Sequence, residues 1–122
     1  MDTNGLKAAI QLYFDACYED DEEKMREVFH SAAHVYGHID GGAFKDSDLE
    51  TFIKVATKPP GAPRPDHPRK DEIISIDFTG ENTAVARVSL RTDVKFYTDI
   101  LSFIRLDGKW TIISKLFSGV PI

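Results

Sequence analysis

The chain has little of several features that define whole classes of protein. It has one cysteine, Cys17, so no disulfide can form within its 122 residues, and a free thiol fits a reducing compartment. No stretch approaches the roughly 20 apolar residues that a membrane-spanning helix needs. The first five residues show no charged-then-apolar signal pattern. We therefore expect a cytoplasmic protein with no membrane partner.

An excess of positive charge is also missing. The chain has 15 Lys and Arg against 20 Asp and Glu, and its formal net charge is −5. Without a basic patch, nucleic acid is excluded as an expected partner. The sequence contains no Gly-rich phosphate loop, no Gly-x-Ser-x-Gly elbow and no Cys/His metal signature. We expect neither a metal nor a cofactor.

Proline is scarce outside one segment. Five of the six prolines lie between residues 59 and 68, where they remove the backbone donors that helices and sheets need. The pattern predicts a loop over 57–70. Four polar residues of this segment suit either a lid or partner site, or a solvated flexible loop: Arg64, Asp66, His67 and Arg69. We expect residues 58–69 to be the most mobile part of the chain.

Apolar residues recur at helical spacing in the first half of the chain. The spacing predicts a first helix over 5–18, a second helix over roughly 22–29 and a third helix from 49 onward. Ser47 and Glu50 form a capping-box pattern before the third helix. The expected caps are Thr3 or Asn4 for the first helix, Asp20 or Asp21 for the second and Ser47 for the third.

Strand patterns dominate the rest. His34–Ile39 predicts a short strand that returns through a turn into Ala43–Phe44. Alternating apolar residues then predict strands around 74–78 and 84–90. Two runs rich in β-branched and aromatic residues, 96–106 and 109–117, meet at Asp107-Gly108 and predict a β-hairpin. Helices followed by strands predict an α+β fold in one domain, residues 1–122.

Both faces of the C-terminal hairpin are largely apolar. One-sided burial would give an alternation of apolar and polar residues, so we expect helices to cover one face and a second copy of the chain to cover the other. The expected partner is therefore the chain itself. The expected interface residues are Leu101, Phe103, Ile113, Lys115 and Phe117.

Asp99 and Lys115 are charged residues among apolar neighbours. If the turn at Gly108 is a three-residue loop with a glycine bulge, Asp99 lies opposite Lys115, on the face away from Trp110. The pair then holds a polar ligand, performs acid–base chemistry or locks the dimer. With a two-residue turn the register shifts, and Asp99 joins the Trp110 face instead.

Histidines and large aromatic residues supply the other candidates. His30, His34 and His38 are four residues apart, but the run passes from a helix end into a strand, so the three cannot share a metal. His34 joins Asp99 as a candidate catalytic residue. The rings serve as core, or they line a pocket for a flat molecule. The expected ligand-binding residues are Tyr13, Phe14, Tyr18, His34, Tyr36, Phe52 and Trp110.

The order of elements resembles the cone-shaped NTF2-like (cystatin-like) fold, which nuclear transport factor 2, ketosteroid isomerase and SnoaL-like cyclases share. More narrowly, the chain resembles the NTF2-like family called "putative lumazine-binding". Ser31 stands where members typically have proline after Phe-His. The resemblance implies three N-terminal helices on a curved, mainly antiparallel sheet, in small bacterial dimers without an assigned reaction. The residues that carry it are Tyr18–His30, Tyr36-Gly37, Thr98–Phe103 and Asp107–Phe117.

Three functions are compatible with this resemblance. The first is a homodimer that binds a small, partly aromatic or hydrophobic molecule in the cone. The second is an isomerase- or dehydratase-type enzyme, in which Asp99 or a pocket histidine removes a proton next to a carbonyl and a tyrosine hydroxyl stabilises the oxyanion. The third is an association module without a ligand. A cavity that holds a titratable group favours the enzyme.

Overall fold

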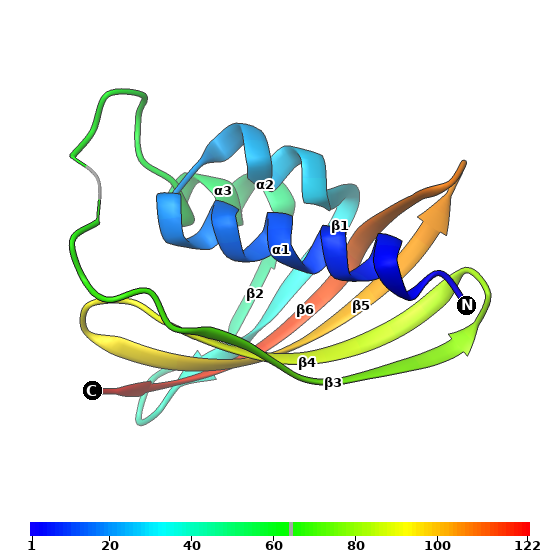
Figure 1. Ribbon diagram of the computed structural model, residues 1–122. Coiled ribbons are helices and arrows are strands. Elements are labelled where there is room, and N and C mark those ends of the chain that lie inside the picture. Colours follow the sequence, from blue (N-terminus) through cyan, green and yellow to red (C-terminus); the bar gives the residue numbers. More distant parts are fainter. Residues whose placement is uncertain (64) are drawn as a thin grey trace.

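Three helices lie on one face of a six-stranded sheet in the computed structural model, which describes residues 1–63 and 65–122. Figure 1 shows the helices as one layer over a strongly curved sheet, whose other face is covered by no labelled element. The expected α+β architecture is confirmed. None of the helices in the described part of the chain is long and apolar enough to cross a membrane. Arg64, one of the loop residues named above, lies outside the described residues.

The first helix, α1 (Thr3–Glu19), starts earlier than its apolar spacing indicates. Its cap is Asp2, whose carboxylate accepts a hydrogen bond from the Gly5 amide at 3.0 Å, and both expected caps lie inside the helix. Asp2 also accepts a hydrogen bond from the Trp110 indole at 3.0 Å. This contact with the sheet fixes Asp2 at the helix start, which the local sequence pattern does not reveal.

The two shorter helices differ in how well their caps were predicted. Helix α2 (Glu22–Val28) begins after Asp21, one of the two expected caps. Helix α3 (Leu49–Ala56) begins after Asp48, whose side chain accepts a hydrogen bond from the Thr51 amide at 2.8 Å. The expectation that Ser47 caps this helix was wrong.

A short strand explains why Ser47 is not the cap. Strand β2 (Lys45–Asp48) pairs antiparallel with β1 (Phe29–Ile39), and Ser47 lies opposite Val35. The ladder continues to Asp48, which lies opposite His34, so the helix begins only at Leu49 and the last extended residue, Asp48, takes the capping position. The expected return strand at Ala43–Phe44 belongs to the connection before β2, and β1 begins well before His34.

The remaining strands are β3 (Asp71–Gly80), β4 (Thr83–Arg91), β5 (Lys95–Leu106) and β6 (Lys109–Pro121). The strand order is β2-β1-β6-β5-β4-β3. Every neighbouring pair is antiparallel except β1 and β6, which run parallel. The sheet is therefore mainly antiparallel, as expected, and β6 lies in its middle between β1 and β5.

The hairpin of β5 and β6 closes through a two-residue turn. Leu106 pairs directly with Lys109, and Asp107 and Gly108 have φ values of 51° and 77°. Positive φ at both central residues is the geometry of a type I′ turn, which matches the twist of the strands it joins. The expectation of a three-residue loop with a bulge at Gly108 was wrong. Asp99 consequently pairs with Phe117 and lies on the same face as Trp110.

Strand β6 carries its bulge farther from the turn, at Ile113. This residue has no partner on β5, because its neighbours Ile112 and Ser114 pair with consecutive residues of that strand. The alternation of buried and exposed side chains therefore restarts one position later. Trp110 and Ile112 are buried, and the next buried side chain is Lys115, on the same face.

The face beneath the helices contains most of the residues that we expected at a dimer interface. Leu101 is 0% exposed and Phe103 is 2% exposed, and both belong to the core of the single chain. Lys115 and Phe117 also point to this side, where Lys115 contacts aromatic rings. The assignment of these four residues to the outer face was wrong. For Leu101 and Phe103 it followed from the wrong turn length, and for Lys115 and Phe117 it followed from strict alternation along β6, which the bulge at Ile113 interrupts. Ile113, at the bulge, is half-buried.

Candidate functional site

A tyrosine, a carboxylate and a lysine meet beneath the helices. The Tyr13 hydroxyl on α1 donates a hydrogen bond to Oδ2 of Asp99 on β5. Nζ of Lys115 on β6 lies 3.9 Å from the same oxygen. Tyr13 and Asp99 are both 0% exposed, and Lys115 is 8% exposed. We call these three residues the buried cluster.

The sequence assembles this cluster by ordinary periodicity and one irregularity. Tyr13 continues the helical stripe that buries Leu6 and Ile10 on α1. Asp99 occupies an inward position of β5, in alternation with buried Leu101. The bulge in β6 turns Lys115 to the same side. The expected proximity of Asp99 and Lys115 is confirmed, although the register that brings them together is a different one.

Aromatic rings surround the Lys115 ammonium. Its nitrogen lies 4.8 Å from the ring centroid of Phe52 on α3, 5.3 Å from that of Tyr13 and 5.7 Å from that of Phe117. At such distances the negative ring faces attract a cation, and most strongly where water is excluded. The cation is therefore held by rings and by one carboxylate.

Asp99 is the carboxylate that the site perturbs most clearly. Its burial raises the pKa of the carboxyl group, while the charge of Lys115 and the hydrogen bond from Tyr13 act in the opposite direction. Burial outweighs both. Oδ2 receives the tyrosine and the lysine, whereas Oδ1 is buried without a hydrogen-bond partner among the described residues. Such an unpaired buried oxygen is rare and costly in a folded protein.

Three neighbouring side chains have raised pKa values. Burial raises the pKa of Tyr13 well above its ordinary value of 10.0, and the charge of Asp99 adds to this. Burial also raises the pKa of the Cys17 thiol to about 11, although the charge of Lys115 opposes the shift. The pKa of Tyr97, on β5, is raised by burial and then by Asp99. These three groups therefore keep their protons at neutral pH.

The arrangement has the parts of a general base. The Asp99 carboxylate lies in apolar surroundings that favour proton uptake, and one of its oxygens is unpaired. A hydroxyl fixes the other oxygen, and a lysine nitrogen lies next to it. No group of three or more His, Cys, Asp or Glu side chains within the described ranges could hold a metal ion.

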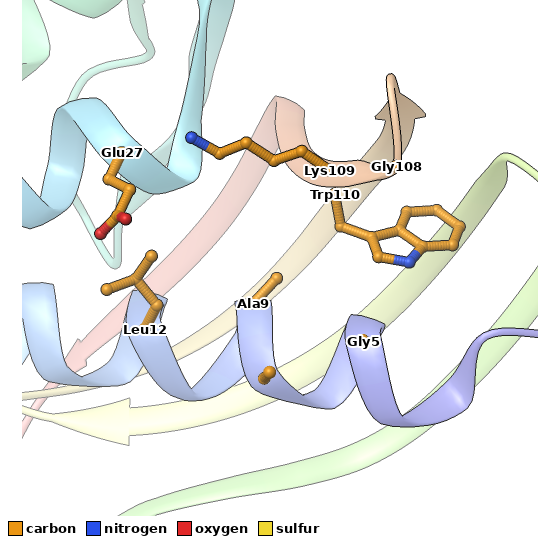
Figure 2. A pocket seen from close by; sticks show the side chains of 8 residues that line it. Gly5, Ala9, Leu12, Glu27, Gly108, Lys109 and Trp110 are labelled. Carbon is orange, nitrogen blue, oxygen red and sulfur yellow. The ribbon is translucent and has the colours of Figure 1, made fainter.

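Two other expected ligand-binding residues lie on the helix side of the sheet but are not part of this cluster. Phe14 is a buried core residue whose ring packs against that of Tyr13, with centroids 6.1 Å apart. Trp110 lines a groove of about 300 Å³ between α1 and the tip of the hairpin, together with Leu12 and Glu27. Figure 2 shows the Trp110 ring over the end of α1 that carries Gly5. Of the expected ligand-binding residues, Tyr13 and Phe52 contact Lys115.

Tyr18 holds the proline-rich segment. Its hydroxyl donates a hydrogen bond to the carbonyl of His67 at 2.9 Å, and the guanidinium of Arg69 lies 5.1 Å from its ring centroid. Arg69 also forms ion pairs with Asp15 on α1 and Asp71 on β3. The described part of this segment is thus attached to the C-terminal half of α1. The expected mobility of the segment stays a prediction.

His34 and Tyr36 lie on the face of β1 that points away from the helices. Their neighbours Ala33 and Val35 are buried beneath the helices, so the alternation turns the two rings outward, stacked 5.7 Å apart. His34 is 3.2 Å from Asp46 on β2. Neither residue is brought together with Asp99, and His38 is exposed on the same outer face.

Sequence reasoning missed two features of the site. It did not associate Tyr13 with Asp99, and it did not include Cys17, which lies one helical turn after Tyr13 and interacts with it. The spacing of four residues between Tyr13 and Cys17 was the available signal, because such residues share a helix face. Nothing local indicates which strand residue that face meets.

Comparisons with known proteins identify the fold and a family. The model of a family described as "Putative lumazine-binding" matches residues 1–118. An NTF2-like protein of unknown function from Shewanella baltica superposes with a TM-score of 0.81 at 22% identity, covering 100% of this chain and 98% of that one. A cystatin-like fold protein from Burkholderia xenovorans gives 0.71 at 18% identity, covering 98% and 92%. The fold is therefore NTF2-like, as expected.

One curated relative has an activity in its name. The chain is 28% identical over 116 residues to "Aldolase FrzH" from Cladobotryum sp, an alignment that covers 93% of this chain and 88% of the relative. The two proteins therefore match over nearly their full lengths.

Proposed function

Because the chain belongs to the family described as "Putative lumazine-binding", we propose that it acts on a small molecule. We propose specifically that it binds a small, partly aromatic carbonyl compound at the buried cluster and removes a proton from the carbon next to the carbonyl. The name of the aldolase relative supports this chemistry, since an aldol reaction begins with the loss of such a proton. The other support for an enzymatic function is the geometry of the buried cluster.

The unpaired oxygen of Asp99 carries the proposal. Oδ1 accepts the proton, while Tyr13 positions the carboxylate through Oδ2 and Lys115 binds the carbonyl end of the substrate. A base whose pKa is raised by burial takes up a proton from carbon more readily than one exposed to water. The cost of leaving Oδ1 unpaired is offset when a substrate occupies it.

The surrounding rings define the body of the ligand. Tyr13, Phe52 and Phe117 present ring surfaces next to Lys115, and Tyr97 packs edge-on against Phe117 with centroids 6.0 Å apart. Phe52, Tyr97 and Phe117 are only partly buried. We propose that the ligand enters between these side chains and places a flat or apolar group against them.

Exchange of carbon-bound hydrogen tests the function directly. Benzylacetone, a ketone with one phenyl ring, is incubated with the protein in D₂O, and loss of the proton signals next to the carbonyl is followed by NMR. We expect exchange with the natural chain and a loss of about 100-fold or more for Asp99→Asn, the usual range for removing a general base. Asp77→Asn, at an exposed position of β3, is the matched control and should exchange normally.

Binding without turnover is the alternative function. It predicts that benzylacetone binds in ligand-observed NMR, that no deuterium enters, and that Asp99→Asn leaves exchange unchanged at the background rate. Equal exchange in the natural chain and in Asp99→Asn would contradict the enzymatic proposal.

We further propose that two chains associate through the outer face of the sheet. This face exposes 50% of Leu116 and carries half-buried Ile100 and Ile104, with a groove of about 250 Å³ between β4, β5 and β6. A second copy of the same face would remove this apolar surface from water. Sedimentation at micromolar concentration should give a dimer that Leu116→Glu weakens and that Val55→Glu, on exposed α3, does not. A monomeric natural chain would contradict it.

A further inference from the structure

Lys115 is unusual for a buried lysine, because its ammonium has three donors and forms no hydrogen bond among the described residues. Its neighbours are Oδ2 of Asp99 at 3.9 Å, beyond ordinary hydrogen-bond distance, and three aromatic rings. The nitrogen therefore lies among ring surfaces and next to one carboxylate oxygen.

Asp99 provides the place where the lysine proton can go. Its Oδ1 is unpaired, and the carboxylate lies next to Nζ. Transfer of one proton from the ammonium to the carboxylate converts a buried ion pair into two neutral groups. Such a transfer becomes easier as the surroundings become less polar, and the amine that it leaves is a nucleophile.

We propose that Nζ of Lys115 forms an imine with the carbonyl carbon of an aldehyde or ketone substrate. The inference rests on the function proposed above and names how Lys115 binds the carbonyl end. The geometry supports it, because the amine, its proton acceptor and apolar ring surfaces for the substrate lie together in one part of the interior.

The step balances without any further reactant. Asp99 takes one proton from the Lys115 ammonium, and the nitrogen lone pair attacks the carbonyl carbon. One of the two protons left on the nitrogen then passes to the carbonyl oxygen, which gives a neutral carbinolamine. Asp99 returns its proton to the carbinolamine hydroxyl, which departs as water, while the nitrogen lone pair forms the protonated imine. The positive nitrogen withdraws electrons from the adjacent carbon, and the Asp99 carboxylate, ionised again, removes a proton from that carbon.

Reductive trapping tests the inference. The protein is incubated with benzylacetone and sodium borohydride, which reduces an imine to a stable secondary amine, and the modified lysines are located by peptide mass spectrometry. We expect the adduct at Lys115 at least about tenfold above that at exposed Lys54, the internal control for non-specific labelling. Lys115→Arg keeps the positive charge but should lose both the adduct and deuterium exchange. Circular dichroism of this variant verifies that it is folded.

The outcomes separate this inference from the function on which it rests. Exchange without an adduct at Lys115, or an unchanged exchange rate in folded Lys115→Arg, would overturn the imine and leave Asp99 as the base. An adduct at Lys115 without exchange would support the imine and contradict the proton transfer. Neither exchange nor an adduct would overturn both.

Discussion

The hydroxyl of Tyr13 donates its hydrogen bond to Asp99, a residue 86 positions away in the chain. One residue belongs to the first helix and the other to the fifth strand, and both are fully buried. The bond therefore links the helical layer to the sheet at a point where the sheet carries a charge. It also selects which oxygen of Asp99 is occupied and which is unpaired.

Removing this hydroxyl should destabilise the fold measurably. We expect Tyr13→Phe to lower the free energy of unfolding by about 1–3 kcal/mol, because a buried carboxylate loses a hydrogen bond while the ring remains. Urea denaturation followed by circular dichroism measures the change. Tyr97→Phe is the matched control, since the Tyr97 ring is only partly buried, and it should change stability by less than about 0.5 kcal/mol. Equal effects of the two changes would contradict the special role of Tyr13.

Removing Lys115 should strand the carboxylate that it faces. We expect Lys115→Met to cost about 3–5 kcal/mol, the range for leaving one buried charge without its partner. The double variant Asp99→Leu with Lys115→Met should recover most of this loss, because neither charge is then buried. A thermodynamic cycle over the two single variants and the double variant measures the coupling. Strictly additive effects would show that the two residues do not interact.

Stability should depend on pH through Asp99. Because the native pKa of Asp99 is raised above its usual 3.8, the folded chain retains this proton at pH values where the unfolded chain has lost it. The contribution of Asp99 to stability is therefore complete below pH 3.8 and decreases as pH rises through the native pKa. The unfolding free energy of the natural chain minus that of Asp99→Asn should therefore fall as the pH rises over this range.

The other titratable groups around Asp99 should not obscure the pH dependence of this difference in unfolding free energy. Tyr13 and Cys17 on α1 and Tyr97 on β5 have raised pKa values and keep their protons below pH 9. Lys115 on β6 is present in both proteins, and α3 contributes the uncharged Phe52. A difference that rises with pH would show that Lys115 outweighs burial.

A side chain at Gly108 should destabilise the hairpin turn. Its φ of 77° is unfavourable for other residues, although a Cβ would meet no atom within 4 Å. We expect Gly108→Ala to cost about 1–2 kcal/mol from backbone strain alone. Asp107→Asn should be nearly neutral, since asparagine tolerates the left-handed conformation that Asp107 adopts at φ 51°. Thermal unfolding distinguishes the two. A neutral Gly108→Ala would contradict the two-residue turn.

Much of the architecture could be predicted from the sequence, because helical spacing and strand alternation are local. The α+β order, the Asp21 cap and the hairpin at Asp107-Gly108 needed only nearby residues. The register of the hairpin did not follow, because Asp-Gly suits both a two-residue turn and a longer bulged loop. That single ambiguity moved Leu101 and Phe103 to the wrong face.

The site was predictable only in part. A carboxylate among apolar residues singled out Asp99, and its proximity to Lys115 was anticipated. The contact with Tyr13 depends on how α1 crosses the sheet, which no local pattern specifies. His34 and Tyr36 were expected in a pocket, but the burial of their small neighbours turns them outward.

The bulge at Ile113 has a consequence for how this chain can change in length. Ile113 lies between Ile112 and Ser114 in β6 and pairs with no residue of β5. A chain shortened by one residue there would retain both flanking ladders, with Lys115 still directed inward, and would lose only the local bend. Deletion of one residue is therefore cheaper at this point than elsewhere in β6, where it would reverse every side chain beyond it.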